Sequence, residues 1–254
     1  MDAYLKRIGA DRPLTPDAES LRELQLRHLL TVPFENLSIH LGEPVVLDDQ
    51  ALVEKIVGRR RGGFCYEVNG AFAALLRSLG YQVTMLSARP SSGGSVGVPF
   101  DHLALRVDAP EPWLVDVGFG TFSHFPLRLD LRTDQPDPGG VFRVVETADG
   151  DLDVLKDGVL EYRLEQRPRV LADYVPTCWW HQTSPLSHFT RSLVCSLLTE
   201  TGRVTLSDRL LVHTSAGERR EERLSTDAET FAAYRDLFGI ELTRLPTVSV
   251  RTEG

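Results

Sequence analysis

Cysteine is scarce in this chain of 254 residues, and its few thiols are scattered. Cys65, Cys178 and Cys195 lie too far apart for the paired spacing of a zinc site, and three are too few for a disulfide framework. The sequence therefore predicts no metal site and no disulfide-stabilised fold. Because free thiols of this kind are typical of a reducing compartment, we expect a cytoplasmic protein.

The chain also lacks an excess of basic charge and any long apolar run. It carries 36 acidic and 28 basic residues, for a net charge of −8 at pH 7. Nucleic acids and anionic membranes attract a basic protein face, so this charge argues against both as partners. No apolar run approaches the roughly 18 residues of a membrane-spanning helix. Residues 1–13 contain charges and no apolar segment, so we expect no secretory signal there.

Local patterns predict an α+β fold in three successive parts. Residues 1–80 carry apolar side chains at helical spacing and are predicted to form a helical domain. Residues 81–175 contain short runs rich in Val, Leu and Trp between Pro/Gly/Ser stretches, which indicates a β-rich domain. Residues 176–254 mix the two patterns and are predicted to form a smaller domain of helices and strands.

The individual elements follow from the same patterns and from their end signals. Thr15 followed by Pro16 predicts the start of the first long helix, and Gly239 predicts the end of the last one. Residues 91–99 are predicted to be a loop. Helices are expected at residues 16–32, 49–59, 65–79, 170–174 and 227–238. Strands are expected at residues 82–88, 102–107, 113–117, 142–146, 152–155, 159–165, 191–198, 204–206 and 209–213.

The segment from Arg59 to Gly70, RRRGGFCYEVNG, carries the strongest chemical signal. Its two adjacent glycines allow a tight loop that delivers Cys65 to the start of a helix. The helix dipole and the upstream arginines favour the thiolate, which is the nucleophile of covalent catalysis. Taken alone, the segment also fits a small buried apolar residue, which is what most free cysteines are. Cys178 and Cys195 lack this setting and are interpreted as core residues.

A thiol nucleophile needs a base, and the base needs an acceptor that orients it. His102 opens one predicted strand, and Asp116 lies in the next, with only a short connection between the two strands. In an antiparallel pair the two side chains can face each other. Each residue alone has an ordinary structural interpretation, as a strand-end histidine or a turn aspartate. Together with Cys65 they indicate a Cys-His-Asp triad.

The other histidines are weaker candidates. His28 and His40 are expected on exposed helical or loop surfaces. His124, close in sequence to Asp116, is a candidate pocket residue. His181 and His188 flank a loop that could reach the site.

Five segments resemble the arylamine N-acetyltransferase family, in the family's order and over about residues 4–242. They are VPFENL at residues 32–37, RRGGFCYEVN at 60–69, HLAL at 102–105, LVDVGFG at 114–120 and TSPLSHF at 183–189. The resemblance implies a helical bundle over residues 1–80, a β-barrel over 81–175 and an α/β lid over 176–254, with a site like that of cysteine proteases.

The resemblance also implies a ping-pong reaction with acetyl-coenzyme A as the acyl donor. Cys65 takes the acetyl group with help from His102, which Asp116 orients, and an arylamine or arylhydrazine then receives it. Coenzyme A is then a substrate, and no bound cofactor or metal is expected. The partners are small molecules, and the chain is expected to be a monomer or homodimer.

By the same resemblance, aromatic and glycine residues beside the motifs line the acceptor and pantetheine cleft. These residues are Phe34, Phe119, Gly120 and Phe189. The main-chain N–H of Cys65 is a candidate donor to the oxyanion of the reaction.

Two departures from the family pattern bear on the substrates. The residue before His102 is Asp101, where the family often has threonine, and a carboxylate facing the cleft would repel coenzyme A phosphates. Residues 121–126, TFSHFP, are bulkier than expected and lack a second glycine. The related amide synthases of ansamycin biosynthesis use the same triad on a carrier-bound polyketide chain and are the main alternative. A binding protein without turnover and a cysteine protease are the other interpretations.

The position of Cys65 generates the first prediction. Its thiol should react with iodoacetamide fastest of the three, at pH values well below the roughly 8.5 of a free thiol, because nearby positive charge favours the thiolate. Peptide mass spectrometry after brief alkylation measures the order of reaction. Faster labelling of Cys178 or Cys195, or near-normal turnover by a Cys65→Ala variant, would remove Cys65 from the role of nucleophile.

Overall fold

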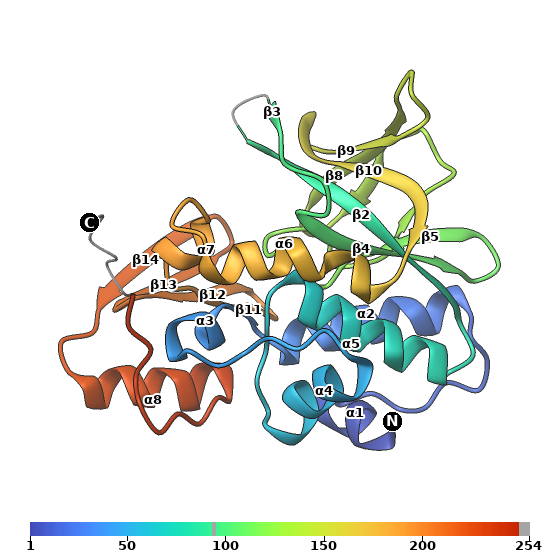
Figure 1. Ribbon diagram of the computed structural model, residues 1–254. Coiled ribbons are helices and arrows are strands. Elements are labelled where there is room, and N and C mark those ends of the chain that lie inside the picture. The colour runs from blue at the N-terminus through green and yellow to red at the C-terminus, as the bar shows by residue number, and fades with distance from the viewer. Residues whose placement is uncertain (93–94, 249–254) are drawn as a thin grey trace.

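Helices fill the first third of the chain in the computed structural model, which describes residues 1–92 and 95–248 (Figure 1). They are α1 (Asp2–Ile8), α2 (Ala18–Thr31), α3 (Leu37–Leu41), α4 (Asp49–Val53) with its one-turn π-helical continuation η1 (Glu54–Gly58), and α5 (Cys65–Ser78). The N-cap of α2 is Asp17, whose carboxylate accepts the Ser20 amide at 2.9 Å, and the predicted cap Thr15 instead hydrogen-bonds to Asp17. Within the described ranges, no helix is both long and apolar enough to cross a membrane.

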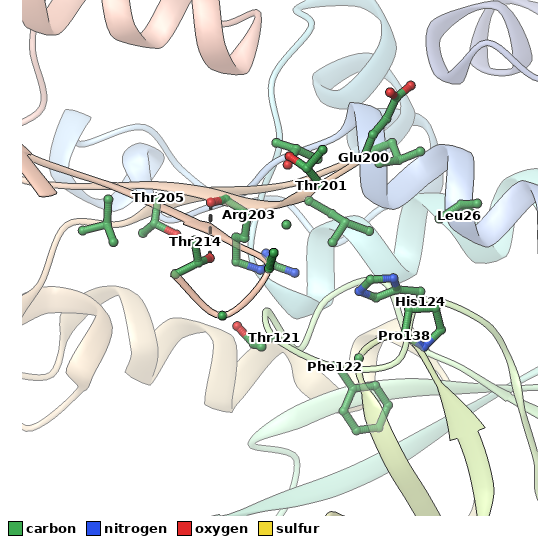
Figure 2. A pocket seen from close by; sticks show the side chains of 18 of the residues that line it. Leu26, Thr121, Phe122, His124, Pro138, Glu200, Thr201, Arg203, Thr205 and Thr214 are labelled. Atoms are coloured by element: carbon green, nitrogen blue, oxygen red, sulfur yellow. Dashed lines mark hydrogen bonds between the residues drawn. The ribbon is translucent and has the colours of Figure 1, made fainter. Parts of the chain in front are cut away.

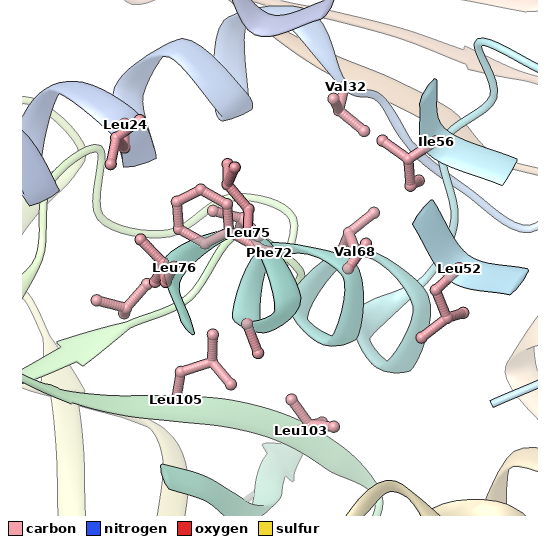
Figure 3. Close-up of a cluster of buried hydrophobic side chains, with 14 of the residues drawn as sticks. Leu24, Val32, Leu52, Ile56, Val68, Phe72, Leu75, Leu76, Leu103 and Leu105 are labelled. Atoms are coloured by element: carbon pink, nitrogen blue, oxygen red, sulfur yellow. The ribbon is translucent and has the colours of Figure 1, made fainter. Parts of the chain in front are cut away.

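Helix α5 lies at the centre of the largest core cluster (Figure 3). Every residue from Cys65 to Leu76 is buried. Phe72 faces Leu24 of α2, and Leu105 of strand β4 (His102–Asp108) packs on the opposite side of the helix. A helix that is apolar on all sides is typical of a core position. This packing fixes Cys65, the first residue of α5.

A nine-stranded antiparallel sheet follows α5 and curls into a nearly closed barrel (Figure 1). The strand order is β6-β5-β4-β2-β10-β9-β8-β7, with β3 paired to β2. Besides β4, the strands are β2 (Gln82–Ser92), β3 (Ser95–Val96), β5 (Pro112–Val115), β6 (Leu127–Arg128), β7 (Gln135–Asp137), β8 (Gly140–Glu146), β9 (Leu152–Lys156) and β10 (Val159–Arg169). Gln135 joins the edge strands, because its Oε1 accepts the Arg128 amide at 2.7 Å and its Nε2 donates to the Arg128 carbonyl at 3.0 Å.

Strand β2 extends beyond its predicted end at residue 88. Its Ser91 pairs with Val96 of β3, so part of the predicted loop 91–99 is a short hairpin. Residues 93 and 94 of that loop lie outside the described residues. The extension follows from tertiary pairing, since β10 runs alongside β2 as far as Pro90, opposite Tyr162.

The last third of the chain builds a five-stranded antiparallel sheet on a strand from the first third. The strand order is β1-β11-β12-β13-β14. The elements are β1 (Phe34–Glu35), α6 (Leu171–Thr183), α7 (His188–Arg191), β11 (Cys195–Thr199), β12 (Gly202–Ser207), β13 (Leu210–Ser215), β14 (Glu218–Arg223) and α8 (Asp227–Phe238). Helix α8 has the predicted bounds, with Thr226 as its N-cap and Gly239 in the left-handed conformation (φ 65°) after its end.

Strand β1 connects the first and the last third of the chain close to Cys65. Phe34 pairs with Ser196 of β11 and forms a bridge to Gly63. Asn36 Nδ2 donates to the carbonyls of Phe189 (3.0 Å) and Ser192 (2.6 Å). The loop before Cys65 and the start of the small sheet are therefore fixed to the same segment.

The structure corrects three expectations for the last third. The helix predicted at 170–174 continues to Thr183 through Pro176, because buried Tyr174 and Cys178 hold it against the core. Residues 188–191, partly assigned to a strand, form α7. Strand β14 is absent from the predictions because its sequence ERREER is exposed throughout and has no apolar alternation.

His28 is buried, which contradicts its predicted exposure. It lies on the same face of α2 as Leu21 and Leu24, its Nε2 is 3.0 Å from the Tyr4 hydroxyl, and its ring centroid is 4.9 Å from that of Phe72. Burial, with a smaller contribution from the nearby Arg7 charge, lowers the pKa of His28 to about 3, so this imidazole is neutral.

His40 is half-buried, with its Nε2 3.1 Å from the Ser192 carbonyl. It was also expected to be exposed, and the contact with the last third of the chain covers it. Sequence spacing within one helix cannot show such a contact between distant segments.

Two buried ion pairs hold the segment around Cys65. Lys55 Nζ lies 2.5 Å from Glu67 Oε1, and Arg61 Nη2 lies 2.9 Å from Glu35 Oε1. All four side chains are at most 6% exposed. Glu67 also accepts the Phe64 amide at 3.3 Å, which satisfies one free N–H at the start of α5. Removal of either cation would leave a carboxylate buried without its counter-charge.

The Lys55–Glu67 pair generates the second prediction. Lys55→Met should lower the free energy of unfolding by about 3–5 kcal/mol, because an uncompensated carboxylate then remains in the core. Urea denaturation measures the loss. The control is Lys6→Met on the exposed face of α1, which should change stability by less than about 0.5 kcal/mol. Equal stability of the two variants would contradict a role for the pair.

Candidate active site

The candidate site is built around the first residue of α5. Phe64 is extended (φ −90°, ψ −178°) and Cys65 begins the helix, so its thiol and main-chain N–H lie at the positive end of the helix dipole. Cys65 is 3% exposed. A Cβ on Gly118 would lie 2.7 Å from the Cys65 Cα. The loop after β5 therefore packs directly on the backbone of Cys65 and requires glycine there.

The β4–β5 hairpin brings His102 and Asp116 together. Leu105 of β4 lies opposite Val115 of β5, which places the start of β4 beside the residue that follows β5. His102 Nε2 lies 2.6 Å from Asp116 Oδ2, and both side chains are buried. The juxtaposition expected from the sequence is present in the structure.

Asp116 has three further hydrogen-bond donors. Its Oδ1 accepts Asn69 Nδ2 and the Gly118 amide, both at 2.9 Å, and its Oδ2 accepts the Tyr162 hydroxyl at 3.3 Å. A buried carboxylate with this many donors is held in a single orientation. The imidazole of His102 is thereby oriented as well.

Sequence reasoning did not identify Asn69 or Tyr162 as site residues. Asn69 lies one helical turn after Cys65 and also bonds to the Leu103 carbonyl at 2.7 Å and the Val117 amide at 2.9 Å. Its place in the cysteine segment, at helical spacing from Cys65, was the available signal. Tyr162 comes from β10 and has no sequence signal, because only the curled sheet brings it to Asp116.

The electrostatics of the site favour a charged His102. Burial by itself lowers the pKa of the imidazole, but the Asp116 charge and hydrogen bond, together with the Cys65 side chain, raise that pKa to about 10. His102 therefore holds its proton at neutral pH. A protonated imidazole beside a thiol is the arrangement of an activated cysteine.

The other two cysteines lie in the core, in agreement with their interpretation from the sequence. Cys178 is 2% exposed and Cys195 is fully buried. Burial raises the pKa of both thiols well above the usual range. Both should therefore react slowly with alkylating agents in the folded protein.

The four predicted cleft residues lie in two groups. Phe119 packs edge-on against His102, with centroids 5.1 Å apart, and the Gly120 carbonyl accepts Arg203 Nη2 at 2.8 Å. Phe34 and Phe189 lie 6.2 Å apart between ring centroids, and Phe189 lies 5.4 Å from Phe64, the residue before Cys65. One aromatic group thus adjoins the imidazole and the other adjoins the start of α5.

A large open groove lies between the loop that follows Gly120 and the small sheet (Figure 2). Its volume is about 1260 Å³, and Cys65, His102 and Asp116 do not line it. Figure 2 shows Thr121 and His124 on the loop side, opposite Arg203 and Thr205 of β12. His124 lines this pocket, as expected. Arg203 also donates to Ser196 Oγ at 3.1 Å, and burial lowers its pKa.

The bulky residues after Gly120 have other contacts. Phe122 is 4% exposed and packs on Phe142 and Tyr162 inside the barrel. The Arg22 guanidinium lies 3.1 Å from the centre of the Phe125 ring. These side chains therefore pack inside the barrel and against α2.

The carboxylate of Asp101 faces a basic partner. His181 Nε2, on α6, lies 2.9 Å from Asp101 Oδ1. The geometry at this nitrogen does not meet that of a hydrogen bond, so the two groups are in close polar contact only. The Asp101 carboxylate, expected from the sequence to face the cleft, therefore lies against the His181 ring.

Comparison with known proteins defines the class and then the family. The family model described as N-acetyltransferase matches residues 17–247. The arylamine N-acetyltransferase of Escherichia coli K12 is 33% identical over 94% of this chain and 88% of that protein. The Mycobacterium tuberculosis H37Rv enzyme of the same name is 34% identical over 95% and 89%. The chain belongs to the arylamine N-acetyltransferase family, which confirms the resemblance found in its sequence.

Solved structures agree with this assignment. The Mycobacterium marinum arylamine N-acetyltransferase in complex with CoA has a TM-score of 0.85 and 32% identity, over 94% of this chain and 92% of that one. The Bacillus cereus NAT3 enzyme has a TM-score of 0.87 and 25% identity, over 95% and 98%, and is described as having a unique Cys-His-Glu catalytic triad. The present chain has Asp116 beside its histidine.

The carboxylate network generates the third prediction. Asp116→Asn should keep the fold but slow acylation of Cys65 by a factor on the order of 10⁴, as in serine-protease triads. NMR titration should show the pKa of His102 falling from its raised value, because the charge that raises it is gone. The control is Asp153→Asn, which removes a partly exposed partner of Arg163. If a folded Asp116→Asn protein is acylated at a rate within a few-fold of the wild-type rate, Asp116 does not have this role.

Proposed function

We propose that this protein transfers an acetyl group from acetyl-coenzyme A to an arylamine or arylhydrazine through an acetyl-Cys65 intermediate. The observation that carries the proposal is the 2.6 Å contact between His102 and Asp116 next to a cysteine at a helix N-terminus. Membership of the family supports the acetyl transfer, and the CoA complex of the Mycobacterium marinum relative supports a CoA thioester as donor.

In the first half-reaction, the Cys65 thiolate attacks the thioester carbonyl carbon. The new carbon–sulfur bond forms while the carbonyl oxygen becomes an oxyanion, for which the main-chain N–H of Cys65 is the proposed donor. The bond to the sulfur of coenzyme A then breaks. His102 gives its proton to that leaving thiolate and becomes neutral.

In the second half-reaction, the amine nitrogen attacks the carbonyl carbon of acetyl-Cys65. Neutral His102 takes a proton from the nitrogen, and the carbon–sulfur bond to Cys65 breaks. The amide leaves, and the thiolate and protonated imidazole are restored. Asp116 keeps its charge throughout and stabilises the imidazolium form of His102.

The proposed acceptor cleft lies between the two aromatic groups. Phe119, which precedes Gly120, packs on His102, and the Phe34–Phe189 pair adjoins Phe64 at the start of α5. Flat apolar walls suit an aryl ring. Coenzyme A is treated as a substrate, and the proposal includes no bound cofactor. The cytoplasmic location, the monomer or homodimer and the domain limits at residues 80 and 175 stay predictions.

The fourth prediction tests the proposed donor and intermediate. After mixing with acetyl-coenzyme A alone, the intact protein should gain one acetyl group, located on Cys65 by peptide mass spectrometry, and lose it when an arylamine is added. The control is Cys195→Ala, which should still be acetylated because that thiol is buried elsewhere.

Two outcomes would overturn the proposal. Acetylation that survives in a folded Cys65→Ala variant would exclude the intermediate. Acylation by p-nitrophenyl acetate without any acetylation by acetyl-coenzyme A would shift the function toward the amide-synthase alternative, with a different thioester as donor.

A further inference from the structure

A second carboxylate–imidazole pair lies beside the triad. Asp101 immediately precedes His102, and its side chain is 21% exposed. His181 comes from α6, its side chain is 7% exposed, and its Nε2 lies 2.9 Å from the Asp101 carboxylate. The mechanism above uses neither residue.

The His181 ring packs among the residues that surround the cleft. Its centroid lies 6.4 Å from Phe64 and 6.0 Å from Tyr66, the two neighbours of Cys65 in the chain. It lies 5.1 Å from Phe189, edge to face. The imidazole therefore packs both against the neighbours of Cys65 and against Phe189, which itself contacts Phe64.

The second ring nitrogen of His181 reaches the start of α7. Nδ1 lies 3.2 Å from Ser187 Oγ, and the same oxygen accepts the Phe189 amide at 3.2 Å. Ser187 is 1% exposed and is the N-cap of α7. The contact with Asp101 is thus connected through His181 and Ser187 to the backbone of Phe189.

His102 itself is held by other groups. The Tyr66 hydroxyl donates to the main-chain carbonyls of Phe100 (2.6 Å) and Asp101 (3.2 Å). His102 also pairs with Ala88 of β2. Loss of the Asp101–His181 contact should therefore disturb the Phe189 side of the cleft more than the triad.

We propose that Asp101 and His181 are a pair of positioning residues that hold Phe189 against the cleft and so set the affinity for the aryl acceptor. This inference rests on the proposed function. The pair joins the residue before β4 to helix α6 of the last third of the chain.

The fifth prediction is a double-mutant cycle with His181→Leu, Asp101→Thr and the double variant. His181→Leu should raise the KM for an arylamine about fivefold, as expected when one buried polar contact and the packing of the ring are lost. The rate of Cys65 acylation by p-nitrophenyl acetate should stay within about twofold, since the triad is held separately. The double variant should be no worse than His181→Leu, because Asp101 acts only through His181.

A further variant and a further measurement keep the inference testable if His181→Leu folds poorly or turnover is absent. His181→Gln removes the imidazole ring and keeps a polar group for Ser187. Hydrogen exchange should increase in a peptide covering residues 186–193 and stay unchanged in one covering 102–108. The control is His213→Leu, at an exposed position on β13.

The outcomes separate the inference from the proposed function. Wild-type protein that forms no acetyl-Cys65 refutes the proposed function, and the exchange experiment still tests the pair. Three results would each refute the positioning role. They are multiplicative effects of the two substitutions on KM, a fall in the acylation rate as large as the rise in the KM for the acceptor, and unchanged hydrogen exchange at residues 186–193.

Discussion

The site depends on one buried carboxylate. Asp116 is 1% exposed and would be costly to bury as an ion without compensation. Its four donors come from β4, α5, β10 and its own loop, through His102, Asn69, Tyr162 and the Gly118 amide. The helical part and the barrel are therefore connected through this group. The same bonds that satisfy the carboxylate also fix the imidazole beside Cys65.

The buried charged groups around Cys65 fix the position of the segment that carries this cysteine. Lys55–Glu67 and Arg61–Glu35 hold the segment before α5 from two sides, inside a core that is otherwise apolar. Buried pairs of this kind add little net stability, because desolvation offsets most of their attraction. Their geometry is specific, however, and they place a cysteine at a helix start without exposing it. The last third of the chain reaches the same point through Asn36.

Much of the site could be predicted because its signals are local. Two glycines before Cys65 and a short hairpin connection between His102 and Asp116 each specify a backbone geometry over a few residues. Helix α8 likewise carries its own cap and its own terminating glycine, and its bounds match the expectation. Three features were not predicted, because each depends on partners distant in sequence. They are the burial of His28, the continuation of α6 through Pro176 and the charged strand β14.

The sequence by itself determined the α+β class, the order of the helical, β-rich and mixed parts, and the three residues proposed to carry the chemistry, because periodicity, turn residues and motif spacing act within short stretches of chain. Only the tertiary structure decided which groups surround them. Tyr162 reaches Asp116 because the sheet curls, and Asp101 meets His181 because α6 crosses beside the site. Such contacts join segments many residues apart, and they are selected by packing and by the need to satisfy buried charge.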